Sequence, residues 1–199
     1  NEEILPGILG RRISIESASK IWNACGLRIG SLATDNNSLH SKVVSEYTAN
    51  LCANAIGQYV FSSILKLSKS EIIYWYKKQK LYYYELMSEL RKGLISALPG
   101  IIVSNPQTGL YLIIDFKHIC DSNFDIENFI EYCATIGKCK IKNKYYTLLL
   151  APMTGFYFDQ KDGRTQARIA IVEQKNKLKL VPVILSELIN KYFDHIRVN

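Results

Sequence analysis

One short segment near the start of the chain carries residue types that can do covalent chemistry. It reads SASKIWNACGLRIG from Ser17 onward, with Lys20 close behind two serines and Arg28 eight residues later. A lysine can form a Schiff base with a carbonyl compound when its surroundings disfavour the ammonium form. Hydroxyl groups and an arginine fork are donors that suit a phosphate. Lys20 is therefore a candidate covalent catalyst, with Ser17, Ser19 and Arg28 as candidate phosphate ligands.

The spacing of these residues carries more information than the S-x-S-K motif alone, because most lysines are simply solvated. We predict a strand over residues 27–34, which places Arg28 inside an apolar strand. An arginine in such a strand usually needs an anionic partner. The commonest biological aldehyde that joins a lysine and brings a phosphate is pyridoxal phosphate. The joint pattern therefore predicts that cofactor, with Lys20 on the aldehyde and the other donors on the phosphate.

The composition limits the class of protein. The chain has 199 residues, of which 48% are hydrophobic and 22% charged, with a net charge of +7, as in an ordinary globular protein. No apolar run is long enough to span a membrane, and no arginine-rich block or aromatic–basic repeat indicates nucleic-acid binding. The odd number of cysteines and the absence of C-x-x-C pairs favour a reducing, cytoplasmic location over disulfides or zinc. The three histidines, at positions 40, 118 and 195, show no metal-ligand spacing.

Hydrophobic periodicity predicts three regions along the chain. In residues 1–68 it predicts strands at 12–16 and 27–34 and helices at 38–51 and 54–67. A long helix at 69–98 follows, with Ser68 as its N-cap and Pro99-Gly100 as its end. For the remainder of the chain, the periodicity predicts an α+β unit. Its strands lie at 101–104, 110–116, 138–144, 145–151 and 167–173, and its helices at 124–136 and 180–196.

Several segments together resemble one family. SASKIWNACGLRIGSLATDN resembles the lysine region of class I/II aminotransferases, the aspartate aminotransferase-like branch of fold type I. EYTANLCANAIGQYVF is similar to the helical segment that approaches the neighbouring subunit's active site in those dimers. LPGIIVSNPQTGLYLIIDF resembles the start of their small domain, and TLLLAPMTGFYF and RTQARIAIVE resemble its last strands. The resemblance covers essentially the whole chain in the family's order.

The resemblance implies a fold and an activity. The fold class is α/β, with residues 1–68 as the C-terminal remnant of the large domain, 69–100 as the connecting helix and 101–199 as the small α+β domain. The activity is transfer of an amino group between an amino acid, such as aspartate or an aromatic amino acid, and a 2-oxo acid. The cofactor is pyridoxal 5′-phosphate and the assembly a homodimer.

The resemblance also implies roles for single residues. Lys20 matches the lysine that binds the cofactor and moves a proton during catalysis. Ser17, Ser19 and Arg28 match the phosphate ligands. Arg168, in the segment QARIAIVE, matches the arginine that binds the substrate α-carboxylate with two parallel hydrogen bonds. A structural salt bridge is the alternative role for Arg168.

Three further residues have weaker assignments. Arg164 is near Arg168 in sequence, but the preceding Lys-Asp-Gly predicts a turn, so it is the weaker carboxylate ligand. Asn54 and Gln58 match positions near the subunit boundary, and helix packing explains them equally well.

The chain departs from the family in what precedes Lys20. Only nineteen residues lie before it. The family's N-terminal half, which supplies a phosphate loop, a ring-stacking aromatic residue and an aspartate for the ring nitrogen, has no counterpart there. Three explanations stay open: a C-terminal piece of a full-length enzyme, the product of a split or decayed gene, or a non-catalytic interaction module.

Overall fold

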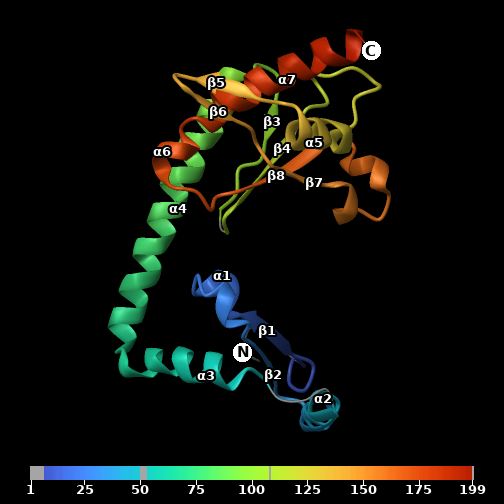
Figure 1. Ribbon diagram of the computed structural model, residues 1–199. Helices are drawn as coiled ribbons and strands as arrows, with labels where there is room; N and C mark the ends of the chain where they lie inside the picture. The colour runs from blue at the N-terminus through green and yellow to red at the C-terminus, as the bar shows by residue number, and fades with distance from the viewer. Residues whose placement is uncertain (1–6, 50–52, 108, 199) are drawn as a thin grey trace. The chain divides into compact units, whose positions relative to one another are not determined.

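The chain folds as two units in the computed structural model, which describes residues 7–49, 53–107 and 109–198 (Figure 1). The units are Asn1–Tyr74 and Trp75–Asn199, so the division falls inside the long helix α4 (Lys69–Ala97). We describe each unit by itself. The domain boundaries at 68/69 and 100/101 stay a prediction.

The N-terminal unit is a small hairpin with helices. Strands β1 and β2 pair antiparallel, with Ser17 opposite Gly30, and short helical turns join them. The elements are β1 (Ile13–Ser17), α1 (Ala18–Ile21), the 3₁₀ helix η1 (Cys25–Leu27), β2 (Gly30–Thr34), α2 (Asn37–Ala49), α3 (Ala55–Ser62) and the 3₁₀ helix η2 (Ser63–Lys66).

Little of the N-terminal unit is buried. Among its described residues only Ala18 and Gly57 are buried, whereas Ile15, Tyr59 and Leu65 are 77%, 82% and 83% exposed. Both strands of the hairpin also have exposed faces. The hairpin is therefore held mainly by backbone hydrogen bonds and by its contact with α3.

The C-terminal unit contains a four-stranded antiparallel sheet and a separate hairpin. The sheet order is β3-β4-β8-β7, with β3 (Ile102–Val103), β4 (Tyr111–Asp115), β8 (Gln166–Ala170) and β7 (Ala151–Pro152). The hairpin pairs β5 (Cys139–Ile141) with β6 (Lys144–Tyr146). The helices are α5 (Ile126–Thr135), α6 (Lys175–Leu178) and α7 (Val181–Val198), and two 3₁₀ turns, η3 (Thr154–Phe156) and η4 (Gln160–Gly163), lie between β7 and β8.

One face of this sheet packs against the helices. Leu112 and Ile114 of β4 are fully buried, and Ala167 and Ile169 of β8 join them in one apolar cluster. The cluster includes large side chains from three helices: Leu90 and Leu94 of α4, Phe129 of α5, and Leu185 and Leu188 of α7. Because side chains alternate along a strand, the residues between them face the other way. The α+β architecture predicted for this part of the chain is confirmed.

The ends of α4 follow the sequence signals. The Ser68 hydroxyl accepts a hydrogen bond from the Glu71 amide, and the Glu71 carboxylate accepts one from the Ser68 amide, which is a reciprocal capping box. The chain leaves the helix at Pro99-Gly100, where Gly100 has φ +96°. The left-handed region suits glycine because it has no Cβ.

Three predicted strands were wrong in detail. The strand predicted at 27–34 begins only at Gly30, because Leu27 ends a 3₁₀ turn and Arg28 has φ +52°. The edge strand predicted at 138–144 is a hairpin that turns at Lys142, where φ is +55°. The strand predicted at 145–151 is interrupted after Tyr146. The first two errors come from turns at Arg28 and Lys142, where no glycine or proline marks the turning residue.

Candidate active site

The predicted lysine lies where a strand passes directly into a helix. Ser17 ends β1 and is the N-cap of α1, and its hydroxyl oxygen accepts a hydrogen bond from the Ser19 amide at 3.2 Å. Lys20 follows in the last turn of α1 and is exposed. The cap keeps the two serines and the lysine in one short turn at the end of the hairpin.

Arg28 lies at the same end of the hairpin. The Ala18 amide donates to the Ile29 carbonyl at 3.0 Å, continuing the ladder that pairs Ser17 with Gly30. Arg28 is exposed and its Nη1 donates to the Cys25 carbonyl at 3.2 Å. Its left-handed backbone costs about 1–2 kcal/mol for a residue other than glycine. The structure thus brings Ser17, Ser19, Lys20 and Arg28 together, although Arg28 lies in a turn and not in a strand.

Helix α3 supports the turn that carries Arg28. The Asn54 side chain caps α3 by accepting from the Gly57 amide, and its Nδ2 donates to the Leu27 carbonyl at 3.1 Å. A Cβ on Gly57 would lie 2.6 Å from the same carbonyl oxygen. The Gln58 side chain donates a hydrogen bond from Nε2 to the nearby Ala53 carbonyl. Both side chains therefore form hydrogen bonds within the N-terminal unit, and their place near a subunit boundary stays a prediction.

The space beside this cluster is small. A hollow of about 80 Å³ is lined by Glu16, Ser17, Ala18, Ile21, Trp22, Ile29, Gly30, Ser31 and Phe61. Ligand pockets typically measure about 300–1,000 Å³. This hollow is therefore too small to hold the whole predicted cofactor. The residue types still suit its two ends, since hydroxyls and an arginine can hold a phosphate and a lysine can join an aldehyde.

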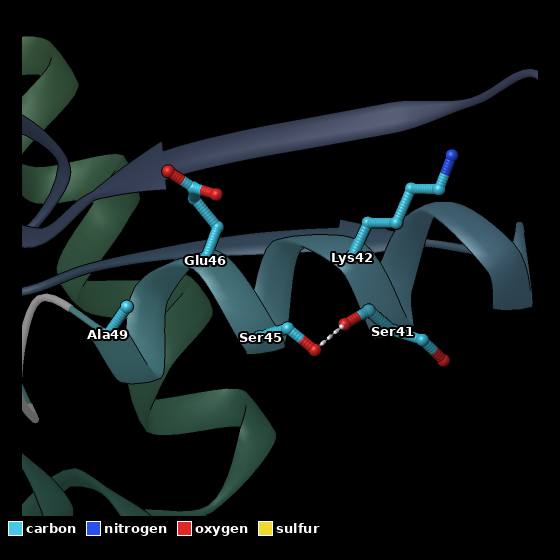
Figure 2. Close-up of a pocket in the computed structure, with 5 residues that line it drawn as sticks. All are labelled: Ser41, Lys42, Ser45, Glu46 and Ala49. Carbon is cyan, nitrogen blue, oxygen red and sulfur yellow. Dashed lines mark hydrogen bonds between the residues drawn. The ribbon is translucent and has the colours of Figure 1, made fainter.

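A second hollow in the N-terminal unit has no connection with these residues. Figure 2 shows its lining side chains, which all come from α2. The polar contact drawn there runs from the Ser45 hydroxyl to the Ser41 carbonyl and is internal to the helix. A surface formed by one helix alone offers no converging donors, so we assign it no role.

Arg168 lies in the C-terminal unit, on the sheet face opposite the apolar cluster. It occupies β8, opposite Ile113 of β4 and Ala151 of β7. Its guanidinium carbon lies 4.4 Å from the centre of the Tyr111 ring and 4.9 Å from that of the Phe156 ring.

The polar partners of Arg168 bear on its two predicted roles. Its Nε is buried and has no hydrogen-bond partner among the described residues, and none of their carboxylates forms an ion pair with it. A buried donor left without a partner costs about 1–3 kcal/mol. The structural salt bridge considered from sequence is thus not found in the described part of the chain, and the cation is available to an external anion.

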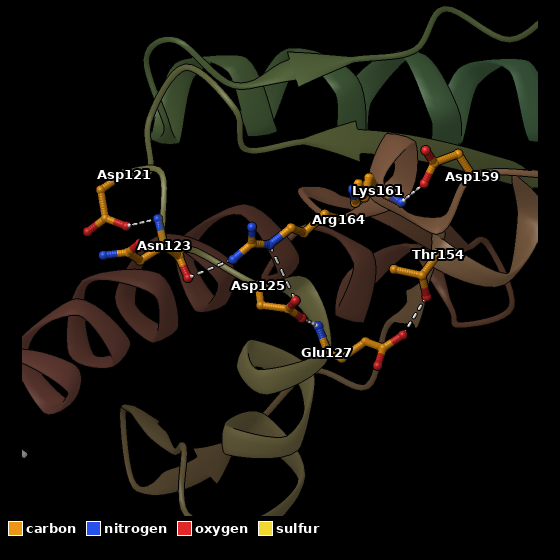
Figure 3. A network of polar contacts seen from close by, with 8 residues as sticks. All are labelled: Asp121, Asn123, Asp125, Glu127, Thr154, Asp159, Lys161 and Arg164. Carbon is orange, nitrogen blue, oxygen red and sulfur yellow. Dashed lines mark hydrogen bonds and ion pairs between the residues drawn. The ribbon is translucent and has the colours of Figure 1, made fainter.

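Arg164, the weaker carboxylate candidate, already has partners. Its Nε lies 3.5 Å from the Asp125 carboxylate and its Nη2 donates to the Asn123 carbonyl at 3.4 Å (Figure 3). The Ile126 amide, at the start of α5, donates to the Arg164 carbonyl. Arg164 therefore joins the 3₁₀ turns to the N-terminus of α5.

Sequence reasoning did not assign a role to Tyr111 or Phe156. Tyr111 is two residues from Ile113, so it shares a sheet face with Arg168 once the register of β4 and β8 is known. That register is not readable from one sequence. Phe156 sits in a 3₁₀ turn whose position over the sheet depends on tertiary contacts, so no local signal could have identified it.

Two classes of site receive no support from the described residues. No group of three or more histidine, cysteine, aspartate or glutamate side chains among them could hold a metal ion. None of the helices in the described part of the chain is long and apolar enough to cross a membrane.

Comparison with known proteins gives a family and a fold. The family model for aminotransferase class I and II matches residues 9–171. Significant sequence matches among curated proteins are absent. Many solved structures match, at identities that support the fold alone.

Three solved aminotransferases illustrate the structural match. The α-aminoadipate aminotransferase of Thermus thermophilus, solved with N-(5′-phosphopyridoxyl)-L-leucine, has a TM-score of 0.66 at 16% identity, over 88% of this chain and 40% of its own. The kynurenine aminotransferase of Pyrococcus horikoshii gives 0.70 at 19%, over 92% and 41%. The multiple substrate aminotransferase of Thermococcus profundus gives 0.71 at 18%, over 94% and 42%. This chain thus spans about two fifths of the length of the structures it matches.

Proposed function

The chain belongs to the class I and II aminotransferase family, and from that premise we propose that it carries the lysine-bearing part of an aminotransferase active site. Its fold is part of fold type I, and pyridoxal 5′-phosphate is the cofactor of the family. The proposed reaction moves an amino group between an amino acid and a 2-oxo acid.

The observation that carries this proposal is the cluster at the end of the β1–β2 hairpin. Lys20 lies there with two serine hydroxyls and an arginine held in a strained backbone conformation. Strained residues that the surrounding fold keeps in place are common at ligand sites. A lysine for an aldehyde and three donors for a phosphate match the two reactive ends of the cofactor.

Each residue has a defined role in the proposed reaction. Bound pyridoxal phosphate would supply an electron sink for the bond broken at the substrate α-carbon. Ser17, Ser19 and Arg28 would hold its phosphate, and Lys20 would hold its aldehyde end through Nζ. Lys20 Nζ would also accept the proton from the substrate α-carbon and donate it back. Arg168 binds the α-carboxylate and so orients the α-carbon.

The proposal includes partners beyond these residues. The substrates are an amino acid, for which aspartate and aromatic amino acids are the first to test, and a 2-oxo acid. We propose that further polypeptide, matching the parts of the solved structures that this chain does not cover, supplies the ring contacts, and that the assembly is a cytoplasmic homodimer. Neither nucleic acid nor a membrane is a partner in this proposal.

Reductive labelling tests the role of Lys20 without requiring activity. The full chain is incubated with excess pyridoxal phosphate, reduced with borohydride, digested and analysed by mass spectrometry. We expect the label on Lys20, at low occupancy, because the polypeptide proposed to supply the ring contacts is not part of this chain. Lys20→Ala should abolish it, whereas Lys66→Ala, at an exposed lysine of η2, should not. Labelling spread evenly over the lysines would refute the assignment.

A non-catalytic interaction module is the second candidate function. It is favoured by the exposed apolar side chains of α3 and η2, among them Ile56, Tyr59 and Leu65. Exposed apolar side chains of this kind mark a contact with another polypeptide when they gather in one patch. Absence of Lys20 labelling, together with loss of self-association in Tyr59→Ser, would favour this candidate over the enzyme.

A further inference from the structure

We propose that Tyr111 and Phe156 are positioning residues that fix the plane of the Arg168 guanidinium so that its edge receives a carboxylate. This inference rests on the proposed function, in which Arg168 is the carboxylate ligand, and adds two residues to it. Neither aromatic residue needs to touch the substrate for this role.

The register of the sheet places the first ring. Arg168 pairs with Ile113, and Tyr111 lies two residues earlier on the same strand and therefore on the same face. Diagonal neighbours on adjacent strands are within reach of aromatic and long side chains. The 4.4 Å separation between the guanidinium carbon and the Tyr111 ring centre follows from this pairing.

The rings take the place of an acidic partner. A planar guanidinium stacks on aromatic faces, and a stacked arrangement keeps its N–H groups in one plane. An aspartate or glutamate could also fix the plane, but it would neutralise the charge. Among the described residues no carboxylate pairs with Arg168, so its orientation is constrained while its positive charge stays uncompensated.

The turn that carries Phe156 is anchored on both sides. Before it, the Thr154 hydroxyl donates to the Glu127 carboxylate of α5 (Figure 3). After it, Arg164 pairs with Asp125, the N-cap of α5. Both ends of the 154–164 segment are thus fastened to one turn of one helix.

A third contact ties the same segment to β8 itself. The Tyr157 hydroxyl donates to the Gln166 side-chain oxygen at 2.6 Å. The Gln166 side-chain nitrogen, Nε2, donates to the Asp115 carboxylate at 3.1 Å. Gln166 is two residues before Arg168 on the same strand. The position of the Phe156 ring relative to Arg168 is therefore set by contacts that do not depend on a ligand.

Arginine side-chain NMR on the full 199-residue chain tests the inference. The Arg168 Nε–H signal, assigned by its loss in Arg168→Lys, should exchange slowly with water because Nε is buried. In Phe156→Leu and Tyr111→Leu we expect the rate at which the Arg168 Nε–H exchanges with water to rise about tenfold. The affinity for succinate, which serves as the probe carboxylate, should fall about three- to tenfold. Tyr111→Phe keeps the ring and should keep both values.

The matched control is Phe158→Leu. Phe158 is fully exposed and lies two residues after Phe156 in the same segment, so its loss should change neither exchange nor succinate binding. The inference is overturned if Phe156→Leu and Tyr111→Leu fold but keep the Arg168 Nε–H exchange rate and the succinate affinity of the wild-type chain.

The proposed function fails in a different way. If succinate does not shift the Arg168 signal in the wild-type chain, Arg168 is not the carboxylate ligand. The exchange rates of the leucine variants would then still decide whether the rings restrain the guanidinium.

Discussion

The two units hold their site residues by different means. In the N-terminal unit, Lys20 and Arg28 sit on an exposed hairpin in which Ala18 is the only buried described residue between positions 7 and 49. In the C-terminal unit, Arg168 sits on a sheet whose other face packs on a large apolar cluster. The first arrangement depends on backbone hydrogen bonds and on the contact of the hairpin turn with the N-terminal end of α3. The second depends on burial.

This difference has a consequence for function. Burial of apolar side chains is the main source of folding free energy, so the C-terminal unit can keep Arg168 in place from its own residues. The lysine cluster lacks that support in the described residues, and in the proposed assembly further polypeptide would supply it. Cofactor binding at Lys20 and carboxylate binding at Arg168 should therefore respond differently to the same perturbation.

A pair of leucine truncations should give the largest contrast. Leu112→Ala, at a fully buried position of β4, should lower the free energy of unfolding by about 3–5 kcal/mol, because it removes buried methyl groups and leaves a cavity. Leu65→Ala, at a side chain 83% exposed, should change it by less than about 0.5 kcal/mol. Urea unfolding followed by circular dichroism measures both. Equal losses would mean that Leu65 is covered in solution, and the contrast between the units would fail.

Gly57→Ala should change the stability of the N-terminal unit by an intermediate amount. The sign of that change tests whether α3 presses on the turn that carries Arg28. In an unconstrained helix, alanine is favoured over glycine by about 1 kcal/mol. Here the added Cβ would lie 2.6 Å from the Leu27 carbonyl oxygen, so α3 must move away from the turn that carries Arg28. We expect a net destabilisation of about 1–3 kcal/mol in the N-terminal unit.

Amide hydrogen exchange in α3 and η1 measures that change. Gly26→Ala is the control, since an added Cβ there meets nothing within 4 Å. A Gly57→Ala variant with slower exchange than the wild-type chain would show that α3 does not press on the turn, and the support assigned to it would be withdrawn.

Much of the fold could be predicted because its signals are local. The capping box at Ser68, the stop at Pro99-Gly100 and the alternation of Leu112 with its neighbours each depend on a few consecutive residues. Lys20 could be proposed for the same reason, since the serines, the lysine and the strand before it are contiguous. The strand assigned to Arg28 was wrong because its left-handed conformation is held by α3, which is distant in sequence.

The surroundings of Arg168 could not be predicted for a related reason. Which residues lie over its guanidinium depends on the register of two strands 50 or more residues apart and on a turn fastened to α5. A single sequence fixes neither. The resemblance could indicate a carboxylate ligand at Arg168, but only the structure shows that the Tyr111 and Phe156 rings lie over its guanidinium.

The smallest predicted effect contrasts two cysteines, one in each unit. Burial raises the pKa of the Cys133 thiol from 9.0 to about 12. Between these values the unfolded chain loses the proton while the folded chain keeps it, so the free energy of unfolding falls as pH rises above about 9. Below pH 9 both states are protonated and this thiol adds no pH dependence.

Replacement of each cysteine isolates this contribution from those of other groups that titrate in the same range. In Cys133→Ala the decline of stability between pH 9 and 10 should be shallower than in the wild-type chain, by at most about 1.4 kcal/mol per pH unit. Cys25→Ala, which removes an exposed thiol of the N-terminal unit, is the matched substitution. Urea unfolding at pH 8, 9 and 10 measures the slopes. A Cys133→Ala slope equal to that of the wild-type chain would mean that this thiol is not buried in solution, and the contrast between a buried C-terminal unit and an exposed N-terminal unit would lose this support.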